Sequence, residues 1–583
     1  MTDPSPSARS PWARVQGWLP LVGLCAVLGL FTEHHLRRLE EHPIPRASQH
    51  NAWELVPRMV HLFQGYRETE RTLERGNWGY ACPGREPIDL TPPALVRELT
   101  QGRLRPLLGR YEDRYWVEMP HCLALAAVAA CAFPGRVEVP AMVMLGYVLL
   151  LIVSVYGIGR EVRSPWTGLL AAALCAQSPA FERYALAVEG YLPVAALSAA
   201  MIWSLLRSRG LNRPLPALAF LGLAWTCVCS GEGFSEAVGA GLAVALPFLF
   251  ELIGGLVEQR HAGWRALRPP LIAACLVGLF ALLLDRTWAL TGFKHILFGL
   301  EETSAGGQAA DPSASPLVAW ASVKMAYVYL SWTTYLGPIA GMALLLGLPW
   351  VFRGEGRRRV SLLAWLATLL VAYDWMTRKA EWYALPLIPP LAVVAAVGLT
   401  AARPRWLRIG TVVLGTALAV TAFSARGLLP GPWSAPLVAI EKRLSPDVVQ
   451  MRKIGDIEAR RLAAFREYQR FVAWTWEALP PDGRLHHVVV AGQPEVPLVH
   501  YAISLLRQDL EPVVLSQQPL APCLDPDSVD LVLIASTDGT LRSLDDRGLP
   551  GDRRALAPWR DRLAHPDGAP VGVYRVLPAV PDP

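Results

Sequence analysis

VPAMVMLGYVLLLIVSVYGI, residues 139–158, contains no charged side chain. An α-helix that crosses the ~30 Å hydrocarbon core of a bilayer needs about 20 apolar residues, because each residue advances the helix by about 1.5 Å. Glu138 precedes the run and Arg160 follows it closely, so the run has membrane length and charged ends. The stretch therefore predicts a transmembrane helix over Val139–Ile158.

Runs of similar length recur along the first 425 residues, whereas the rest reads like a soluble sequence. Hydrophobic residues make up 52% of the 583 residues and charged residues only 18%, against about a quarter in ordinary soluble domains. The pattern predicts an all-α polytopic membrane protein. The other predicted spans, which bring the total to about eleven, are Val15–Thr32, Trp166–Ser178, Gly190–Leu206, Pro214–Cys229, Ala237–Val257, Pro270–Leu284, Met325–Phe352, Ser361–Met376, Ala384–Ala401 and Ile409–Ser424.

Arginines cluster in the short loops on one side of these spans. Under the positive-inside rule that side is cytoplasmic, which places residues 1–14 inside the cell and predicts a multi-pass protein of the inner (plasma) membrane. The net charge of +6 then reports topology and does not indicate a nucleic-acid partner. The loops predicted to be cytoplasmic are Arg160–Ser164, Arg207–Arg213, Glu258–Arg268, Arg353–Arg359 and Ala402–Arg408.

The first external loop is predicted to be large, covering residues 33–138. The apolar stretch Pro120–Phe133 inside it is short for a span, and a crossing there would place every later arginine loop outside. We therefore expect a re-entrant or surface-lying helix at this stretch. With this loop, residues 15–425 form the predicted transmembrane domain.

The chain after the last span is predicted to be external, or periplasmic. Residues 426–479 read as a linker with an amphipathic helix over 445–479, and residues 480–583 as a small α/β domain. No glycine-rich phosphate-binding spacing accompanies the strands, so a nucleotide-binding domain is not expected. The predicted elements are the strands His487–Ala491, Pro512–Leu515, Val529–Ala535 and Val571–Val576 and the helix Pro497–Leu506.

Ionisable residues at the outer ends of the spans are the candidates for chemistry, because burying charge in a membrane is costly and such residues mark functional cavities. Arg378 and Lys379 break the positive-inside pattern, which an anionic headgroup or phosphate bound there would explain. Four external groups stand out: His50–Glu54, Tyr115–Pro120 with Glu118, Phe181–Tyr191 with Arg183 and Glu189, and Arg378–Tyr383.

Three segments, in this order, resemble membrane glycosyltransferases of the GT-C class, which includes the aminoarabinose-lipid transferases and the family 39 protein mannosyltransferases. The first is the juxtamembrane stretch Tyr115–Leu125. The second is GLLAAALCAQSP, residues 168–179, followed by an arginine and an acidic residue, and the third is RKAEWYALPLIPPL, residues 378–391. Judged by the order and spacing of these segments, the resemblance covers roughly residues 15–425, which is the predicted transmembrane domain.

The resemblance implies a transferase that moves a monosaccharide from a polyprenyl-phosphate donor to a lipid, glycan or protein acceptor at the outer membrane face, inverting the anomeric centre. In such enzymes a carboxylate of the first external loop removes the acceptor proton as general base. Glu54 is the candidate for that base. Glu118 and Glu189 match the acidic residues that assist it.

The resemblance also implies a phosphate site and a substrate cavity. Arg378 and Lys379, with Tyr383, would bind the donor phosphate and stabilise the leaving group, and Asn51 and Arg183 are candidates for the cavity. The histidines show no recurring ligand spacing, so no metal ligand and no cofactor is predicted, and a divalent metal is left open.

Asn51 stands where the class commonly has an acidic pair, and asparagine cannot act as a base. Glu54 lies one helical turn further on and reaches the same cavity if this stretch is helical. The departure supports a second interpretation, a catalytically silent relative that binds a lipid-linked sugar or scaffolds an envelope complex. A transporter is a third, but it would show internal repeats and charges at mid-membrane. We see no repeat in the sequence, and the acidic candidates lie at the outer edge of the membrane.

Overall fold

The structure is a computed structural model in which two compact units are distinguished. We call them the helical unit (Met1–Arg38, Tyr111–Cys122 and Met144–Gln450) and the mixed unit (Leu39–Arg110, Leu123–Val143 and Met451–Pro583). The described residues are 11–44, 121–188, 191–208, 385–401, 486–491, 496–515, 529–534, 556–558, 563–564 and 570–576, with single positions or short pieces within 56–91, 213–223, 341–370, 409–415 and 461–476.

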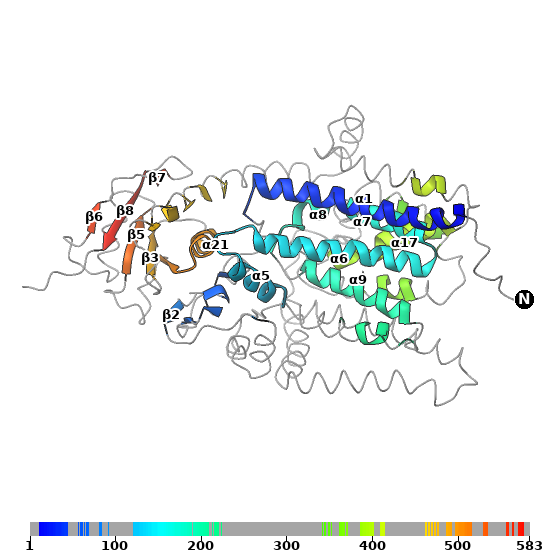
Figure 1. The fold of residues 1–583 in the computed structure, drawn as a ribbon, viewed down its shortest axis with the longest axis horizontal. Helices are drawn as coiled ribbons and strands as arrows, with labels where there is room; N and C mark the ends of the chain where they lie inside the picture. The colour runs from blue at the N-terminus through cyan, green and yellow to red at the C-terminus, as the bar shows by residue number, and fades with distance from the viewer. Residues whose placement is uncertain are drawn as a thin grey trace, which may run out of the picture. The chain divides into compact units, whose positions relative to one another are not determined.

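Long apolar helices dominate the helical unit (Figure 1). Three described helices are long and apolar enough to cross a membrane, over Trp18–Glu41, Val139–Val162 and Tyr191–Ser208. These three helices agree with the predicted class, a polytopic helical membrane protein. The predicted spans Ala237–Val257 and Pro270–Leu284 lie outside the described residues. The described helices are α1 (Pro11–Glu41), α6 (Val139–Val162), α7 (Pro165–Ala176), α8 (Pro179–Tyr184), α9 (Tyr191–Ser208) and α17 (Ile388–Ala401).

α7 is enclosed along nearly its whole length, with every residue from Thr167 to Ala176 buried. Its sequence is apolar on all sides, as expected of a helix with neighbours all around it. Small residues let those neighbours approach: a Cβ on Gly159 of α6 would lie 2.8 Å from the Cα of Gly168 of α7, and a Cβ on Gly23 of α1 would lie 2.7 Å from the side chain of Leu169. Close backbone contact at small residues is typical of helices packed in membranes.

α17 runs antiparallel to α7 and packs along it. Thr167, in the first turn of α7, contacts Thr400, near the end of α17, with 2.9 Å between the two Oγ1 atoms. Arg163, just before α7, donates a hydrogen bond to the carbonyl oxygen of Ala401. Because these contacts join the start of one helix to the end of the other, the end of α7 lies toward the start of α17.

The other helix directions follow from contacts of the same kind. α1 runs parallel to α7, because Gly23 lies against Leu169 and His35 lies against Phe181, further along both segments. A short connection joins the end of α6 to the start of α7, and the two helices run antiparallel. These relative directions agree with the alternation predicted from the arginine loops, while the side that faces the cytoplasm stays a prediction.

A β-sheet forms the C-terminal part of the mixed unit, with strand order β4-β3-β5-β8-β6 and β7 paired to β8. β3 pairs in parallel with β4 and β5, and β8 pairs antiparallel to β5. The four predicted strands coincide with β3, β4, β5 and β8 to within two residues. The elements are β3 (His486–Ala491), α21 (Val496–Leu506), β4 (Leu510–Leu515), β5 (Val529–Ile534), β6 (Leu556–Pro558), β7 (Leu563–Ala564) and β8 (Pro570–Val576).

Parts of the first loop belong to the same unit. A short antiparallel pair joins β1 (Tyr66–Glu68) and β2 (Ala81–Pro83), and α5 covers His121–Ala132. At 12 residues α5 is about 18 Å long, too short to cross a bilayer. Its helical form and short length match the prediction for Pro120–Phe133. The described positions of the predicted amphipathic helix 445–479 are helical from 461 to 476, and Phe465 and Phe471 are buried.

Candidate functional site

α8 and the four residues after it form a buried corner of the helical unit. Sequence reasoning expected an external loop here, yet Phe181, Tyr184 and residues 185–188 are all buried. Backbone hydrogen bonds close the corner, from the Ala185 amide to the Phe181 oxygen and from the Ala187 amide to the Tyr184 oxygen. The apolar sequence ALAV after two aromatic residues gives this segment enough apolar surface to pack rather than face solvent. The chain therefore enters Glu189 from a packed segment.

His35 of α1 ties that helix to this corner. Its Nδ1 lies 2.9 Å from the carbonyl oxygen of Phe31 and its Nε2 lies 3.4 Å from the carbonyl oxygen of Phe181. The imidazole stacks on the Phe31 ring at 4.2 Å between centroids and is only 1% exposed. His35 is thus a buried histidine with both ring nitrogens close to main-chain carbonyl oxygens. The i, i+4 spacing of Phe31 and His35 on an apolar helix was the available signal.

The start of α17 is buried like the corner. Leu385, Leu387 and Ile388 are at most 1% exposed. Leu385 follows Tyr383 by two residues, so the segment that carries Arg378, Lys379 and Tyr383 leads directly into this buried helix start.

The antiparallel packing of α7 and α17 places two of the predicted groups at one end of a helix pair. α8 and the approach to Glu189 follow the end of α7, and the segment after Arg378 enters at the start of α17. With Thr167 and Thr400 marking the opposite end, both ends lie on the same side. Two of the three segments that resemble the GT-C class, residues 168–179 and 378–391, thus contribute described residues to this helix pair, in α7 and at the start of α17.

The candidate residues themselves fall mostly outside the described part of the chain. Arg183 lies in α8, but its side chain is not described. Among the described residues, no group of three histidine, cysteine, aspartate or glutamate side chains could hold a metal ion. The candidates that lie outside the described residues are Asn51, Glu54, Glu118, Glu189, Arg378, Lys379 and Tyr383.

Comparisons with known proteins found similar solved structures. No protein-family model and no curated protein sequence matches the chain. ArnT from Cupriavidus metallidurans in the apo state is 12% identical, with a TM-score of 0.49 over 96% of this chain and 98% of that one. The same protein bound to undecaprenyl phosphate is 14% identical, with a TM-score of 0.48 over 97% of this chain and 98% of that one.

A second similar protein is the oligosaccharyltransferase of Archaeoglobus fulgidus. Its complex with Zn and sulfate is 12% identical, with a TM-score of 0.40 over 89% of this chain and 73% of that one. ArnT and this oligosaccharyltransferase are glycosyltransferases of the GT-C class, the class that the sequence motifs resemble.

Proposed function

We propose that this protein is a membrane glycosyltransferase, which moves a monosaccharide from a polyprenyl-phosphate donor to a lipid, glycan or protein acceptor. The reaction takes place at the outer face of the inner membrane and inverts the anomeric carbon. The proposal includes the predicted topology, with about eleven spans, a cytoplasmic N-terminus and an external C-terminal α/β domain.

The packing of α7 against α17 is the observation that supports the proposal most. A transfer reaction needs an acidic side chain beside the acceptor and cations beside the leaving phosphate, within reach of one sugar. In the sequence these groups lie about 190 residues apart, at Glu189 and at Arg378 with Lys379. The contact of Thr167 with Thr400 fixes the helix directions so that both segments meet the helix pair at the same end.

The proposed chemistry follows from the residue types. The carboxylate of Glu54 takes the proton of the acceptor hydroxyl or amine while the acceptor atom attacks the anomeric carbon. The bond between that carbon and the phosphate oxygen breaks, and the electron pair leaves with the polyprenyl phosphate. Arg378 and Lys379 stabilise the added negative charge on the leaving group. Glu118 and Glu189 orient the acceptor or the base.

Conversion of the carboxylates to amides tests the base. Transfer of radiolabelled sugar from membrane lipid is measured for wild type, Glu54→Gln and Glu189→Gln, at equal expression. Loss of a general base lowers the rate by about 10²–10⁴-fold, and we expect such a loss for Glu54→Gln and a smaller one for Glu189→Gln. Glu33→Gln is the matched control, because Glu33 is exposed and its partner among the described residues is Arg37, four residues along α1. Full transfer by both variants would refute the assigned base.

The cation pair is tested separately from the base. We expect Arg378→Ala and Lys379→Ala to raise the KM for the lipid donor at least tenfold, whereas Arg37→Ala, which removes an exposed arginine of α1, leaves it unchanged. Cysteine labelling of residue 378 from the outside checks its side. Labelling only from the arginine-rich side would remove the donor site and the enzymatic proposal with it.

Asn51 supports one alternative function, that of a catalytically silent relative that binds a lipid-linked sugar without transferring it. That protein would bind undecaprenyl phosphate through Arg378 and Lys379 but transfer no sugar in wild-type form. Restoring an acidic side chain with Asn51→Asp distinguishes the two. Activity that appears only in Asn51→Asp favours the silent relative, and activity already present in wild type favours the enzyme.

A further inference from the structure

Three hydrogen bonds attach α5 and the turn after it to α21 and the residues that follow α21. The phenol of Tyr501 donates to the carbonyl oxygen of Val137 at 2.8 Å. The amide of Gln508 donates to the carbonyl oxygen of Ala130 at 2.9 Å, and the Gly135 amide donates to the carbonyl oxygen of Leu505 at 3.2 Å. All these residues belong to the mixed unit. Two side chains of the C-terminal segment thus donate hydrogen bonds to main-chain carbonyl oxygens of the first loop.

The turn depends on this support because it has little packing of its own. Residues 132–136 are exposed, and the Phe133 side chain is 60% exposed. Gly135 has a φ of +79°, a left-handed conformation that residues with a Cβ rarely adopt. Among the residues of α5 with a described side chain, the buried ones are the small residues Ala126, Ala127 and Ala130, which offer a modest contact surface. Directional hydrogen bonds therefore set the position of the turn.

Gln508 also binds the early part of the same loop. Its Oε1 accepts a hydrogen bond from Nε2 of Gln64 at 2.6 Å, while its Nε2 donates to Ala130. Gln64 follows Glu54 by ten residues, and Ala130 follows Glu118 by twelve. One glutamine therefore anchors both stretches that lead to the candidate carboxylates of the external loop.

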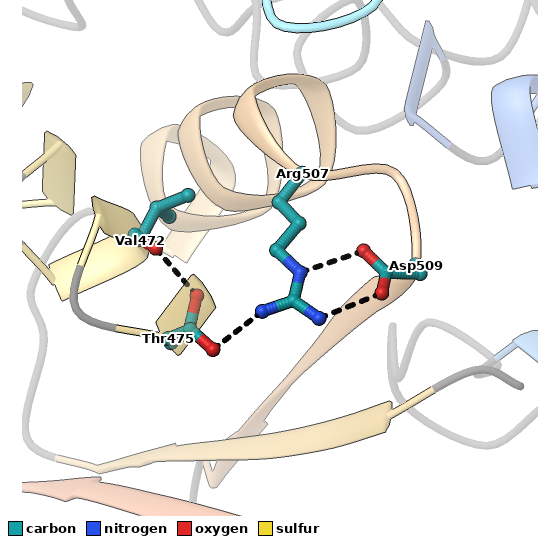
Figure 2. A network of polar contacts seen from close by, with 4 residues as sticks. All are labelled: Val472, Thr475, Arg507 and Asp509. Carbon is teal, nitrogen blue, oxygen red and sulfur yellow. Dashed lines mark hydrogen bonds and ion pairs between the residues drawn. The ribbon is translucent and has the colours of Figure 1, made fainter. Parts of the chain in front are cut away.

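A network of polar contacts holds the end of α21 in place (Figure 2). Arg507 follows α21 directly, and its guanidinium binds Asp509 through two hydrogen bonds of 2.8 Å, from Nε and Nη2. Its Nη1 donates to the carbonyl oxygen of Thr475, and its Cζ lies 4.6 Å from the centre of the Trp476 ring. A fork of this kind fixes direction as well as distance. The backbone amide of His486 in turn donates to the Asp509 oxygen at 2.8 Å, which ties the anchor to the sheet.

We propose that the C-terminal segment positions the external loop for the transfer reaction, with Gln508 and Tyr501 as its positioning residues. This proposal rests on the proposed function. Gln508 and Tyr501 hold the two stretches of loop that continue to Glu54 and Glu118, and Arg507 holds the helix end from which they act. Neither Gln508 nor Tyr501 touches the substrate, so their removal lowers the probability that the carboxylates are correctly placed and leaves donor binding unchanged.

Substitutions in the full-length protein isolate each contact. Tyr501→Phe removes only the hydroxyl, Gln508→Met removes both of its bonds at similar size, and Gln508→Glu keeps the acceptor for Gln64 but removes the donor to Ala130. Ser504→Ala is the matched control, because Ser504 is buried in the same helix and its hydroxyl makes no hydrogen bond with the described residues. Loss of one buried hydrogen bond changes a local equilibrium by roughly threefold to tenfold.

Two measurements decide the proposal. Hydrogen exchange of the amides of residues 130–139 is expected to accelerate about threefold to tenfold in Tyr501→Phe and Gln508→Met and to stay unchanged in Ser504→Ala. Sugar transfer is expected to lose kcat by a similar factor while the KM for the lipid donor stays within about twofold. A purely structural role would lower the amount of folded enzyme without this split.

The outcomes separate this proposal from the proposed function. Unchanged exchange at residues 130–139 in Gln508→Met overturns the anchoring. Faster exchange with unchanged kcat overturns the positioning role while leaving the transferase intact. A wild-type protein that transfers no sugar overturns the proposed function and the positioning role together, and the exchange result then decides only whether the C-terminal segment anchors the loop.

Discussion

α7 in the helical unit and the end of α21 in the mixed unit are both buried, but different forces hold them. α7 packs through Gly159, Gly168 and Leu169 with hardly a polar side chain among its buried residues. The end of α21 packs around Arg507, whose side chain is 0% exposed and carries a full charge. One site is held by shape and the other by a polar network.

The difference matches the solvents predicted for the two units. In a bilayer the lipid tails are as apolar as leucine, so helices associate through close backbone contact and not through exclusion of water. Outside the bilayer a buried arginine is tolerated when every strong donor meets an acceptor in good geometry. The comparison predicts that enlarging a side chain between packed helices destabilises the helical unit. Removing one partner of a buried polar contact is predicted to destabilise the mixed unit.

Arg507→Met should have the largest effect. It removes the partner of the partly buried Asp509 carboxylate and leaves the Thr475 oxygen without its donor. Breaking one side of a buried ion pair costs about 3–5 kcal/mol, and because Asp509 retains 24% exposure we expect a value near the lower limit. Thermal unfolding in detergent micelles measures it.

The matched control is the same substitution in an exposed pair. Arg37 and Glu33 lie 2.8 Å apart on α1 with side chains 68% and 58% exposed, and such helical pairs contribute about 0.3–0.5 kcal/mol. Arg37→Met should therefore have little effect, and Arg507→Met combined with Asp509→Leu should recover part of the loss. Equal effects at both arginines would remove the distinction between the two units.

Gly168→Ala should be the next largest change, and it tests packing by shape. An added Cβ would overlap the carbonyl oxygen of Tyr156, which belongs to the backbone of α6 and cannot rotate away. Overpacking costs about 1–3 kcal/mol. Gly146→Ala is the control on α6, because nothing lies within 4 Å of its added Cβ, and alanine there should be neutral or slightly stabilising. A neutral Gly168→Ala would show that α6 and α7 are less tightly packed than described.

Much of the architecture could be predicted from residue patterns, because the signals are local. The runs that form α1, α6 and α9 have membrane length, and the short apolar runs of the C-terminal segment predicted β3, β4, β5 and β8. The buried corner after α7 could not be predicted in the same way. α8 has only six residues, two of them aromatic, and a segment this short is expected to be a loop. Its burial becomes clear only from a neighbour such as Phe31 of α1, whose ring packs against Phe181.

The candidate site could be predicted only as separate segments. Residue types and a family resemblance selected Glu54, Glu118 and Glu189, but no local rule states which helix faces which. The contact of Thr167 with Thr400 supplies that information for α7 and α17, since it joins positions 233 residues apart. The role of Gln508 could not be predicted from the sequence either, because nothing local indicates that it accepts a hydrogen bond from Gln64, 444 positions earlier.

Alkaline pH should destabilise the mixed unit through Tyr501, with a smaller effect. Burial raises the pKa of the Tyr501 phenol well above 10.0, and the Glu138 carboxylate adds to the shift. The unfolded chain releases this proton above pH 10.0 while the folded chain keeps it, so stability is full below pH 10 and falls as pH rises beyond it. The slope is about 1.4 kcal/mol per pH unit for one proton. Tyr501→Phe should lack this component, and an identical alkaline slope in both proteins would contradict the buried phenol.

The smallest expected effect is the coupling between Thr167 and Thr400, the contact that fixes the direction of α17. A double-mutant cycle with Thr167→Val and Thr400→Val isolates the bond between their Oγ1 atoms. Hydrogen bonds between membrane helices average about 0.6 kcal/mol, because the unfolded helices also find partners in the bilayer. Ser198→Ala removes only a bond within α9, to the Ala195 oxygen, and should show no coupling to Thr400→Val. Because this bond does not titrate, its coupling should be the same at pH 7 and at pH 10, unlike the Tyr501 contribution. A coupling of zero would leave the hydrogen bond from Arg163 to the Ala401 oxygen and the packing of α7 along α17 as the evidence for their direction.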